Sequence, residues 1–125
     1  MRLLLDSHVV LWAASSPAQL ASAARAAIEN TDNDVFVSVA SAWELAIKAG
    51  LGRLRMPADL EEALDRRGFQ RLGISFTHAA AAGALPRHHG DPFDRMLIAQ
   101  AQSESLTLVT RDRGLAAYGV PIVQA

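Results

Sequence analysis

The sequence predicts a single α/β domain of three layers, an α/β/α sandwich whose helices cover both faces of a mainly parallel sheet of about five strands. Short continuous apolar runs alternate along the chain with longer segments of helical character, which is the pattern of βαβ units. The 125 residues suffice for one hydrophobic core, and no repeat or linker divides them. We therefore treat residues 1–125 as one domain.

The first half of the chain alternates strand, helix, helix and strand. Three leucines form a buried strand, and an apolar segment follows them almost at once. The alanine-rich stretch after the Ser-Ser-Pro break favours a helix, and a polar cluster ends it. The predicted elements are a strand over residues 3–5, a helix from residue 9 to the break at 15–17, a helix over 19–30 and a strand over 35–38.

Proline, glycine and threonine mark the element boundaries of the second half. Gly50 and Gly52 end one helix, Pro57 opens the next, Thr77 is the expected cap of a third, and Pro121 suggests that the last strand lies at an edge. The predicted elements are helices over 40–51, from 57 to about 68, over 77–85 and over 93–104, strands over 71–76, 106–110 and 120–123, and a loop over 86–92.

Composition excludes several classes of protein. The formal net charge of −1 rules out a strongly basic coat for nucleic acid, so RNA or DNA would have to meet a local patch. The absence of cysteine excludes disulfides, thiolate zinc sites and a cysteine nucleophile. No run approaches the ~20 apolar residues of a membrane span, and no signal peptide is expected. We expect a cytoplasmic protein with no membrane association.

Four acidic residues occupy positions where a charge is costly. Asp6 follows the first predicted strand and Asp112 follows the strand over 106–110, so both should point into the crevice at the carboxyl ends of parallel strands. Glu44 lies within an apolar helical stripe expected to face the sheet, and Asp94 precedes a similar stripe. The stripe residues are Ala40, Trp43, Ile47 and Leu51 around Glu44, and Leu97, Ile98 and Ala101 after Asp94.

Each acid also has an ordinary structural explanation. Asp6 could cap the following helix, Glu44 could pair with Lys48 one turn later, Asp94 could interact with a helix dipole, and Asp112 could belong to a turn. If these four explanations applied separately, the location of all four acids at the same end of one sheet would be a coincidence. Because unpaired buried carboxylates cost several kcal/mol, a shared divalent cation explains them together.

The ligand set indicates which cation and which substrate to expect. Carboxylate oxygens without cysteine suit Mg²⁺ or Mn²⁺ better than Zn²⁺. Magnesium keeps several waters and prefers sites that a phosphate completes, so the expected substrate is a phosphodiester or phosphoanhydride. The expected reaction is hydrolysis, in which the metal activates water for attack on phosphorus.

Four segments of the chain, at residues 3–12, 37–48, 91–101 and 108–112, read LLLDSHVVLW, VSVASAWELAIK, DPFDRMLIAQA and LVTRD. In order and spacing they resemble the motifs of PIN-domain ribonucleases, and in particular of VapC-type toxins from bacterial toxin–antitoxin pairs. The resemblance spans nearly the whole chain. It implies a PIN-like fold and an endoribonuclease in which Asp6, Glu44, Asp94 and Asp112 hold one or two Mg²⁺ or Mn²⁺ ions.

The resemblance also implies partners: a cognate VapB-like antitoxin, an RNA substrate such as tRNA or rRNA, and a homodimer. Ser7 and Thr110 match positions where small hydroxyls support the first and fourth acids, although caps and turns would also explain them. Asp91 is interpreted as a helix cap rather than a fifth acid. Arg95 could offset the negative charge or contact phosphate, and an exposed helix arginine is the ordinary alternative.

Other polar and aromatic residues are assigned no role. His88 and His89 are expected in a solvated loop, because no third histidine lies at ligand spacing. Trp12 and Trp43 are expected in the core, although exposure near the cleft would make them candidates for base stacking or for an antitoxin groove. The cations that could form a basic patch for the RNA backbone, or simply be scattered over the surface, are Lys48, Arg53, Arg55 and Arg87.

Three rival enzyme or domain classes fit less well. A haloacid-dehalogenase-type phosphatase also starts from an aspartate after its first strand, but needs a second acid where this chain has His8. A dinucleotide oxidoreductase needs a glycine-rich turn after that strand, and a receiver domain needs paired acids and a late lysine. The non-enzymatic alternative is a PIN-like module that binds RNA or protein without cleavage.

Overall fold

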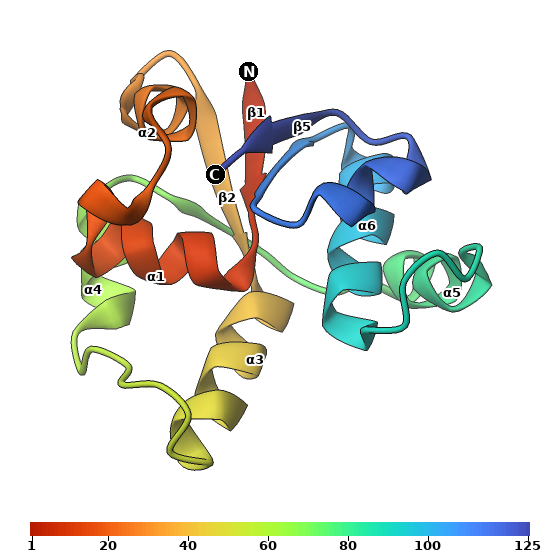
Figure 1. Cartoon of the computed structure of the whole chain (residues 1–125), viewed down its shortest axis with the longest axis horizontal. Coiled ribbons are helices and arrows are strands. Elements are labelled where there is room, and N and C mark those ends of the chain that lie inside the picture. Colours follow the sequence, from red (N-terminus) through yellow and green to blue (C-terminus); the bar gives the residue numbers. More distant parts are fainter.

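Five parallel strands form the central sheet, in the order β3-β2-β1-β4-β5 (Figure 1). The computed structural model describes residues 1–125. The central strand β1 carries three leucines with no exposed surface, because helices cover both of its faces. The strands are β1 (Arg2–Leu5), β2 (Asp34–Ser38), β3 (Gln70–Leu72), β4 (Thr107–Thr110) and β5 (Ile122–Gln124).

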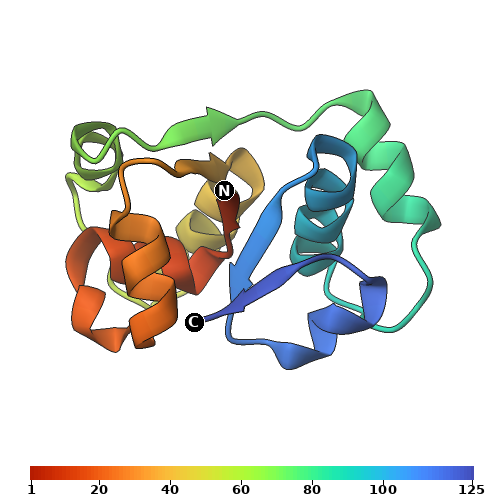
Figure 2. The same ribbon diagram turned by 90° about the horizontal axis from the view of Figure 1, so that it is seen from above.

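Six α-helices and two 3₁₀ turns complete the three layers, which Figure 2 shows from above. No helix of the chain has the length and apolarity that a membrane crossing requires. The helices are α1 (Ser7–Ser15), α2 (Ser22–Glu29), α3 (Val39–Gly50), α4 (Leu60–Arg66), α5 (Phe76–Ala84) and α6 (Pro92–Glu104), with 3₁₀ turns at Pro17–Gln19 and Arg113–Tyr118.

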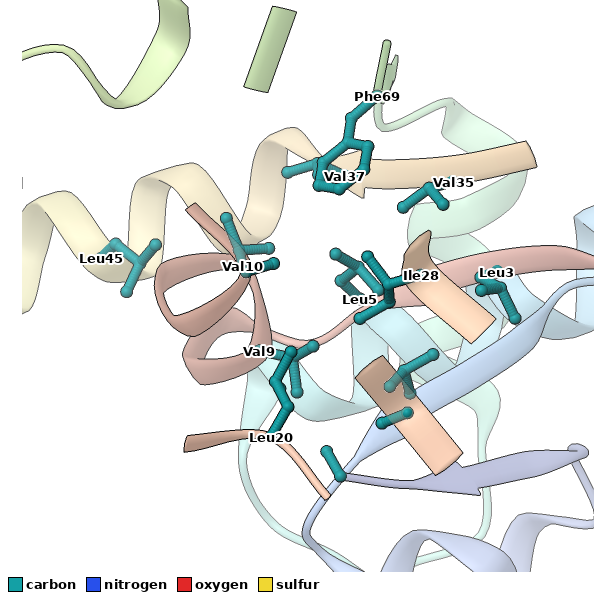
Figure 3. Close-up of a cluster of buried hydrophobic side chains, with 14 of the residues drawn as sticks. Leu3, Leu5, Val9, Val10, Leu20, Ile28, Val35, Val37, Leu45 and Phe69 are labelled. Carbon is teal, nitrogen blue, oxygen red and sulfur yellow. The ribbon is translucent and has the colours of Figure 1, made fainter. Parts of the chain in front are cut away.

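The core has two halves, one on each face of the sheet. Leu3 and Leu5 point into the half formed with α1, α2, α3 and α4 (Figure 3). Leu4 points the other way, into the half formed with α6 and the second 3₁₀ turn. The two-residue period of a strand explains this division. The α/β/α sandwich with a mainly parallel sheet of about five strands is therefore confirmed, and the sheet is parallel throughout.

Most predicted elements are present, and the differences lie at their ends. The helix predicted over 19–30 begins at Ser22, because a 3₁₀ turn precedes it. The strand predicted over 71–76 ends at Leu72, and Ser75 rather than Thr77 caps α5 in a capping box with His78. The 3₁₀ turn after Asp112 was not predicted. The last strand begins two residues later than expected and lies at an edge, as predicted.

The prediction for the orientation of α3 was wrong. The predicted inward stripe included Trp43, Ile47 and Leu51, yet these three side chains are exposed, Trp43 by 63%. The buried face instead carries Ala40, Ser41, Glu44 and Leu45. The physical reason is that α3 continues beyond the end of β2, where it packs against α1 and α6 instead of a sheet face (Figure 1).

Candidate active site

The four predicted acids lie at the carboxyl edge of the sheet. Asp6 follows β1 and caps α1, and Asp112 follows the neighbouring strand β4 and caps the second 3₁₀ turn. Glu44 lies in α3, which follows β2, and Asp94 lies in the first turn of α6. Parallel strands end at one edge, so residues separated by up to 106 positions in sequence meet there.

Three of these acids line one cleft of about 380 Å³, and Glu44 lies buried beside it. A slightly larger hollow, about 430 Å³, lies at the opposite edge between residues 28–35 and 67–69, and it contains no group of three possible metal ligands. The cleft at the carboxyl edge is therefore the candidate site. Its lining residues are Asp6, His8, Trp12, Lys48, Asp94, Arg111 and Asp112.

Asp6 and Asp94 both have raised pKa values because the acids are buried and close together. Burial raises the pKa of Asp6, and the charge of Glu44 adds to the rise. Burial also raises the pKa of Asp94 from 3.8 to about 7, with further contributions from the charges of Asp91, Glu44 and Asp6. The influence of Glu44 on both residues shows that Asp6, Glu44 and Asp94 form one electrostatic cluster.

Hydroxyl groups hold two of the acids in place. The Ser7 hydroxyl donates a hydrogen bond to Oε1 of Glu44, whose Oε2 lies 3.1 Å from the Nζ of Lys48. The Thr110 hydroxyl lies close enough to Asp6 to lower its pKa, and it accepts from the backbone N–H of Asp112 at 3.0 Å. Ser7 therefore contacts Glu44 rather than the first acid, Asp6, and Thr110 contacts the backbone of the fourth acid, Asp112.

Asp91 and Arg95 support the backbone next to the cluster. The Asp91 carboxylate accepts from the N–H groups of Phe93 and Asp94 at 2.8 and 3.1 Å, so it is the helix cap that the sequence favours. The guanidinium of half-buried Arg95 donates to four backbone carbonyls, those of Ala82, Leu85, Pro86 and His89. It is neither a surface arginine nor directed at the acids.

His89 was wrongly assigned to a solvated loop. Its Nε2 lies 3.1 Å from Oδ2 of Asp112 and 3.5 Å from Oδ2 of Asp94. Ligand atoms of His89, Asp94 and Asp112 all lie within 4.8 Å of one another, close enough to share a metal ion. The one feature of the sequence that could have indicated this position of His89 is its place two residues before the capping residue Asp91. Its neighbour His88 is exposed and packs on Tyr118.

Two cations lie at the rim of the cleft. Lys48 belongs to the basic patch considered from sequence, whereas the other three members, Arg53, Arg55 and Arg87, are exposed and do not line the cleft. Arg111 was not anticipated. Its guanidinium lies 4.1 Å from the ring centroid of Trp12, which is partly buried and not fully in the core. This arginine covers one face of the ring and so limits base stacking there.

Comparisons with known proteins agree with this architecture. The sequence matches the family model of the PIN domain over residues 3–121. Ribonuclease VapC22 of Mycobacterium tuberculosis (strain ATCC 25618 / H37Rv) is 37% identical over 121 residues, which cover 94% of this chain and 92% of that protein.

Solved structures share the fold at lower sequence identity. One similar chain comes from the crystal structure of VapBC2 from Rickettsia felis bound to a DNA fragment from their promoter. Its TM-score is 0.70 at 15% sequence identity, and the match covers 99% of this chain and 98% of that one. A chain in the structure of FitAcB from Neisseria gonorrhoeae is similar with a TM-score of 0.61 and 22% identity, covering 98% and 96%.

Proposed function

The chain belongs to the PIN-domain family, and we propose from this membership and from the site that it is a divalent-metal-dependent endoribonuclease of VapC type. The observation that carries the proposal is that Asp6, Asp94 and Asp112, from separate elements, line one cleft and that Glu44 is buried beside it. Family membership supplies the reaction class, hydrolysis of RNA phosphodiester bonds. The cleft supplies the residues that would perform it.

The residues present fit a hard divalent cation. The donors of the quartet are carboxylate oxygens, which Mg²⁺ and Mn²⁺ prefer. Burial first, and then the negative charges of Asp91, Glu44 and Asp6, raise the pKa of Asp94 to about 7, so the site holds carboxylates that lack sufficient compensating positive charge. A cation bound there would supply a Lewis acid that activates water and stabilises the leaving oxygen. We assign the quartet as its ligands and Mg²⁺ or Mn²⁺ as the ion.

Residues of the chain itself would orient these ligands and receive the substrate. Ser7 would restrict the rotation of Glu44 through its hydrogen bond, and Thr110 would hold the backbone of Asp112. Lys48 and Arg111 place positive charge at the rim of the cleft, where an RNA phosphate would approach the acids. This local positive charge is consistent with a protein whose overall charge is near zero.

We further propose that the chain acts as the toxin of a toxin–antitoxin pair, with a VapB-like antitoxin as its partner and a homodimer as its usual state. The likeness to a chain of the VapBC2 structure supports this partner. Protein partners bury apolar surface, and α3 exposes an unusual amount of it along one side. A target among cellular RNAs, such as tRNA or rRNA, would place the activity in the cytoplasm. The exposed residues of α3 are Val39, Trp43 and Ile47, with Leu51 directly after the helix.

The proposal is tested by incubating the purified, antitoxin-free protein with total cellular RNA in Mg²⁺ or Mn²⁺. We expect the wild-type protein to produce discrete RNA fragments, and we expect no fragments in EDTA or with the Asp6→Asn variant. Asp32→Asn changes an exposed aspartate far from the cleft and should cleave like the wild type. No cleavage with either metal would favour a binding module that lacks catalysis. An active Asp6→Asn protein would remove Asp6 from the mechanism.

A further inference from the structure

We propose that His89 is a positioning residue of the acidic cluster, which holds the Asp112 carboxylate for the cation through its Nε2–H and does not itself bind the cation. The inference rests on the proposed function, because it takes the four acids as metal ligands. It adds to that function a residue from the loop before α6.

The hydrogen bonds of the imidazole ring determine which nitrogen carries the proton. Nδ1 of His89 lies 3.1 Å from the backbone nitrogen of Asp91, whose N–H can only donate. Nδ1 is therefore the acceptor, and a neutral ring must carry its proton on Nε2. Nε2 lies 3.1 Å from Oδ2 of Asp112, to which it donates. A nitrogen that carries a proton has no lone pair for a metal ion.

The backbone around His89 is fixed from two sides. The Tyr118 hydroxyl accepts from the N–H of His89 at 2.8 Å, and Arg95 donates to its carbonyl at 3.3 Å. Arg95 also bonds to three further carbonyls, which ties this loop to the end of α5. The ring is thus held over the acids by contacts that a solvated loop would lack.

Both oxygens of the Asp112 carboxylate receive a hydrogen bond. Oδ1 accepts from the N–H of Gly114 at 2.9 Å, and Oδ2 accepts from His89. The two donors fix the rotation of the carboxylate and leave its remaining lone pairs free for a cation. Partners of this kind typically contribute about 10-fold to 100-fold to metal affinity, because a ligand held in place loses less freedom when the metal binds.

Direct ligation by His89 would require a different arrangement of protons. The ring proton would have to move to Nδ1, where it would face the N–H of Asp91 and break the hydrogen bond between them. That N–H belongs to the residue that caps α6. The geometry therefore favours a donor to Asp112, and the two roles predict different spectra and different responses to substitution.

The test measures Mn²⁺ affinity by electron paramagnetic resonance of the free ion, for the wild type, His89→Ala, His89→Gln and His88→Gln. We expect His89→Ala to bind at least ~10-fold more weakly. His89→Gln should recover most of the affinity, because its amide N–H can reach the same carboxylate. His88→Gln is the matched control at the exposed neighbour and should bind like the wild type. Thermal melts in EDTA establish that each variant is folded.

Pulsed electron paramagnetic resonance of bound Mn²⁺ provides a second readout. The wild type should lack the ¹⁴N coupling of a directly bonded imidazole, and its presence would overturn the proposal. Equal affinity of wild type and His89→Ala would also overturn it, as would a His89→Gln protein as weak as His89→Ala. These outcomes leave the proposed function intact. A wild-type protein that binds no Mn²⁺ would instead overturn the proposed function together with this inference.

Discussion

Asp94→Asn is expected to stabilise the metal-free protein at neutral and higher pH. Burial, and then the charges of Asp91, Glu44 and Asp6, raise the pKa of Asp94 from 3.8 to about 7 in the folded state. A carboxyl with a raised pKa binds its proton more tightly when the chain is folded. The stability that it contributes is therefore present below about pH 4 and is lost as the pH rises towards about 7.

The size of the effect follows from the pKa and the exposure of the side chain. A rise from 3.8 to about 7 corresponds to ~4 kcal/mol at ~1.4 kcal/mol for each pH unit, as an upper limit. The Asp94 side chain keeps 24% of its surface exposed. Solvent screening lowers the energy of a partly exposed charge, so we expect a loss of ~2 kcal/mol between acidic and slightly alkaline pH.

Urea unfolding followed by circular dichroism, in EDTA at about pH 5 and about pH 8, measures the part of this loss that lies above about pH 5. The fall in the free energy of unfolding between these two pH values should be smaller for Asp94→Asn than for the wild type by ~1 kcal/mol, because asparagine stays neutral throughout and part of the loss occurs below about pH 5. Asp32→Asn should behave like the wild type, and Mn²⁺ at the higher pH should stabilise only proteins that retain Asp94. An equal fall in wild type and Asp94→Asn would refute the electrostatic argument.

Three further substitutions test other contacts. Leu45→Ala should lower the free energy of unfolding by ~2–5 kcal/mol and Ile47→Ala by under ~1 kcal/mol, since α3 buries Leu45 and exposes Ile47. If urea unfolding shows the larger loss for Ile47→Ala, α3 presents the opposite face to the core. Arg95→Lys should lower the melting temperature nearly as much as Arg95→Met, because one ammonium cannot replace bonds to four carbonyls, and full stability of the lysine variant would contradict this. Ser7→Ala should weaken Mn²⁺ binding and RNA cleavage by ~10-fold, since Glu44 loses its tether; unchanged affinity would make Ser7 a packing residue only.

Local patterns predicted the sheet and the location of the acids well. Leu3, Leu4 and Leu5 form an uninterrupted apolar run because both faces of β1 are covered, and Asp6 and Asp112 follow strands that end at the same edge. These features depend on the periods of strands and on the rule for parallel sheets. They can be inferred without knowing how distant segments pack.

Features that depend on packing between distant segments could not be predicted. The exposed side of α3, marked by Trp43, is apolar like a core face, and only the position of the helix beyond the sheet shows that it meets solvent. Ser75 and Thr77 are both possible caps, and the place where β3 ends decides between them. His89 lies in a loop whose conformation depends on Arg95 and Tyr118, two residues that no local pattern connects to it.

The order of the strands has a consequence for how the chain is synthesised. β1 is made about 100 residues before β4, the strand with which it pairs on one side. Asp112 comes later still, two residues after the end of β4. A growing polypeptide thus holds only Asp6 and Glu44 until residue 94 is added, and it lacks both Asp112 and the strand that positions it until β4 has been made. Truncation before β4 would therefore leave any fragment unable to assemble the cleft.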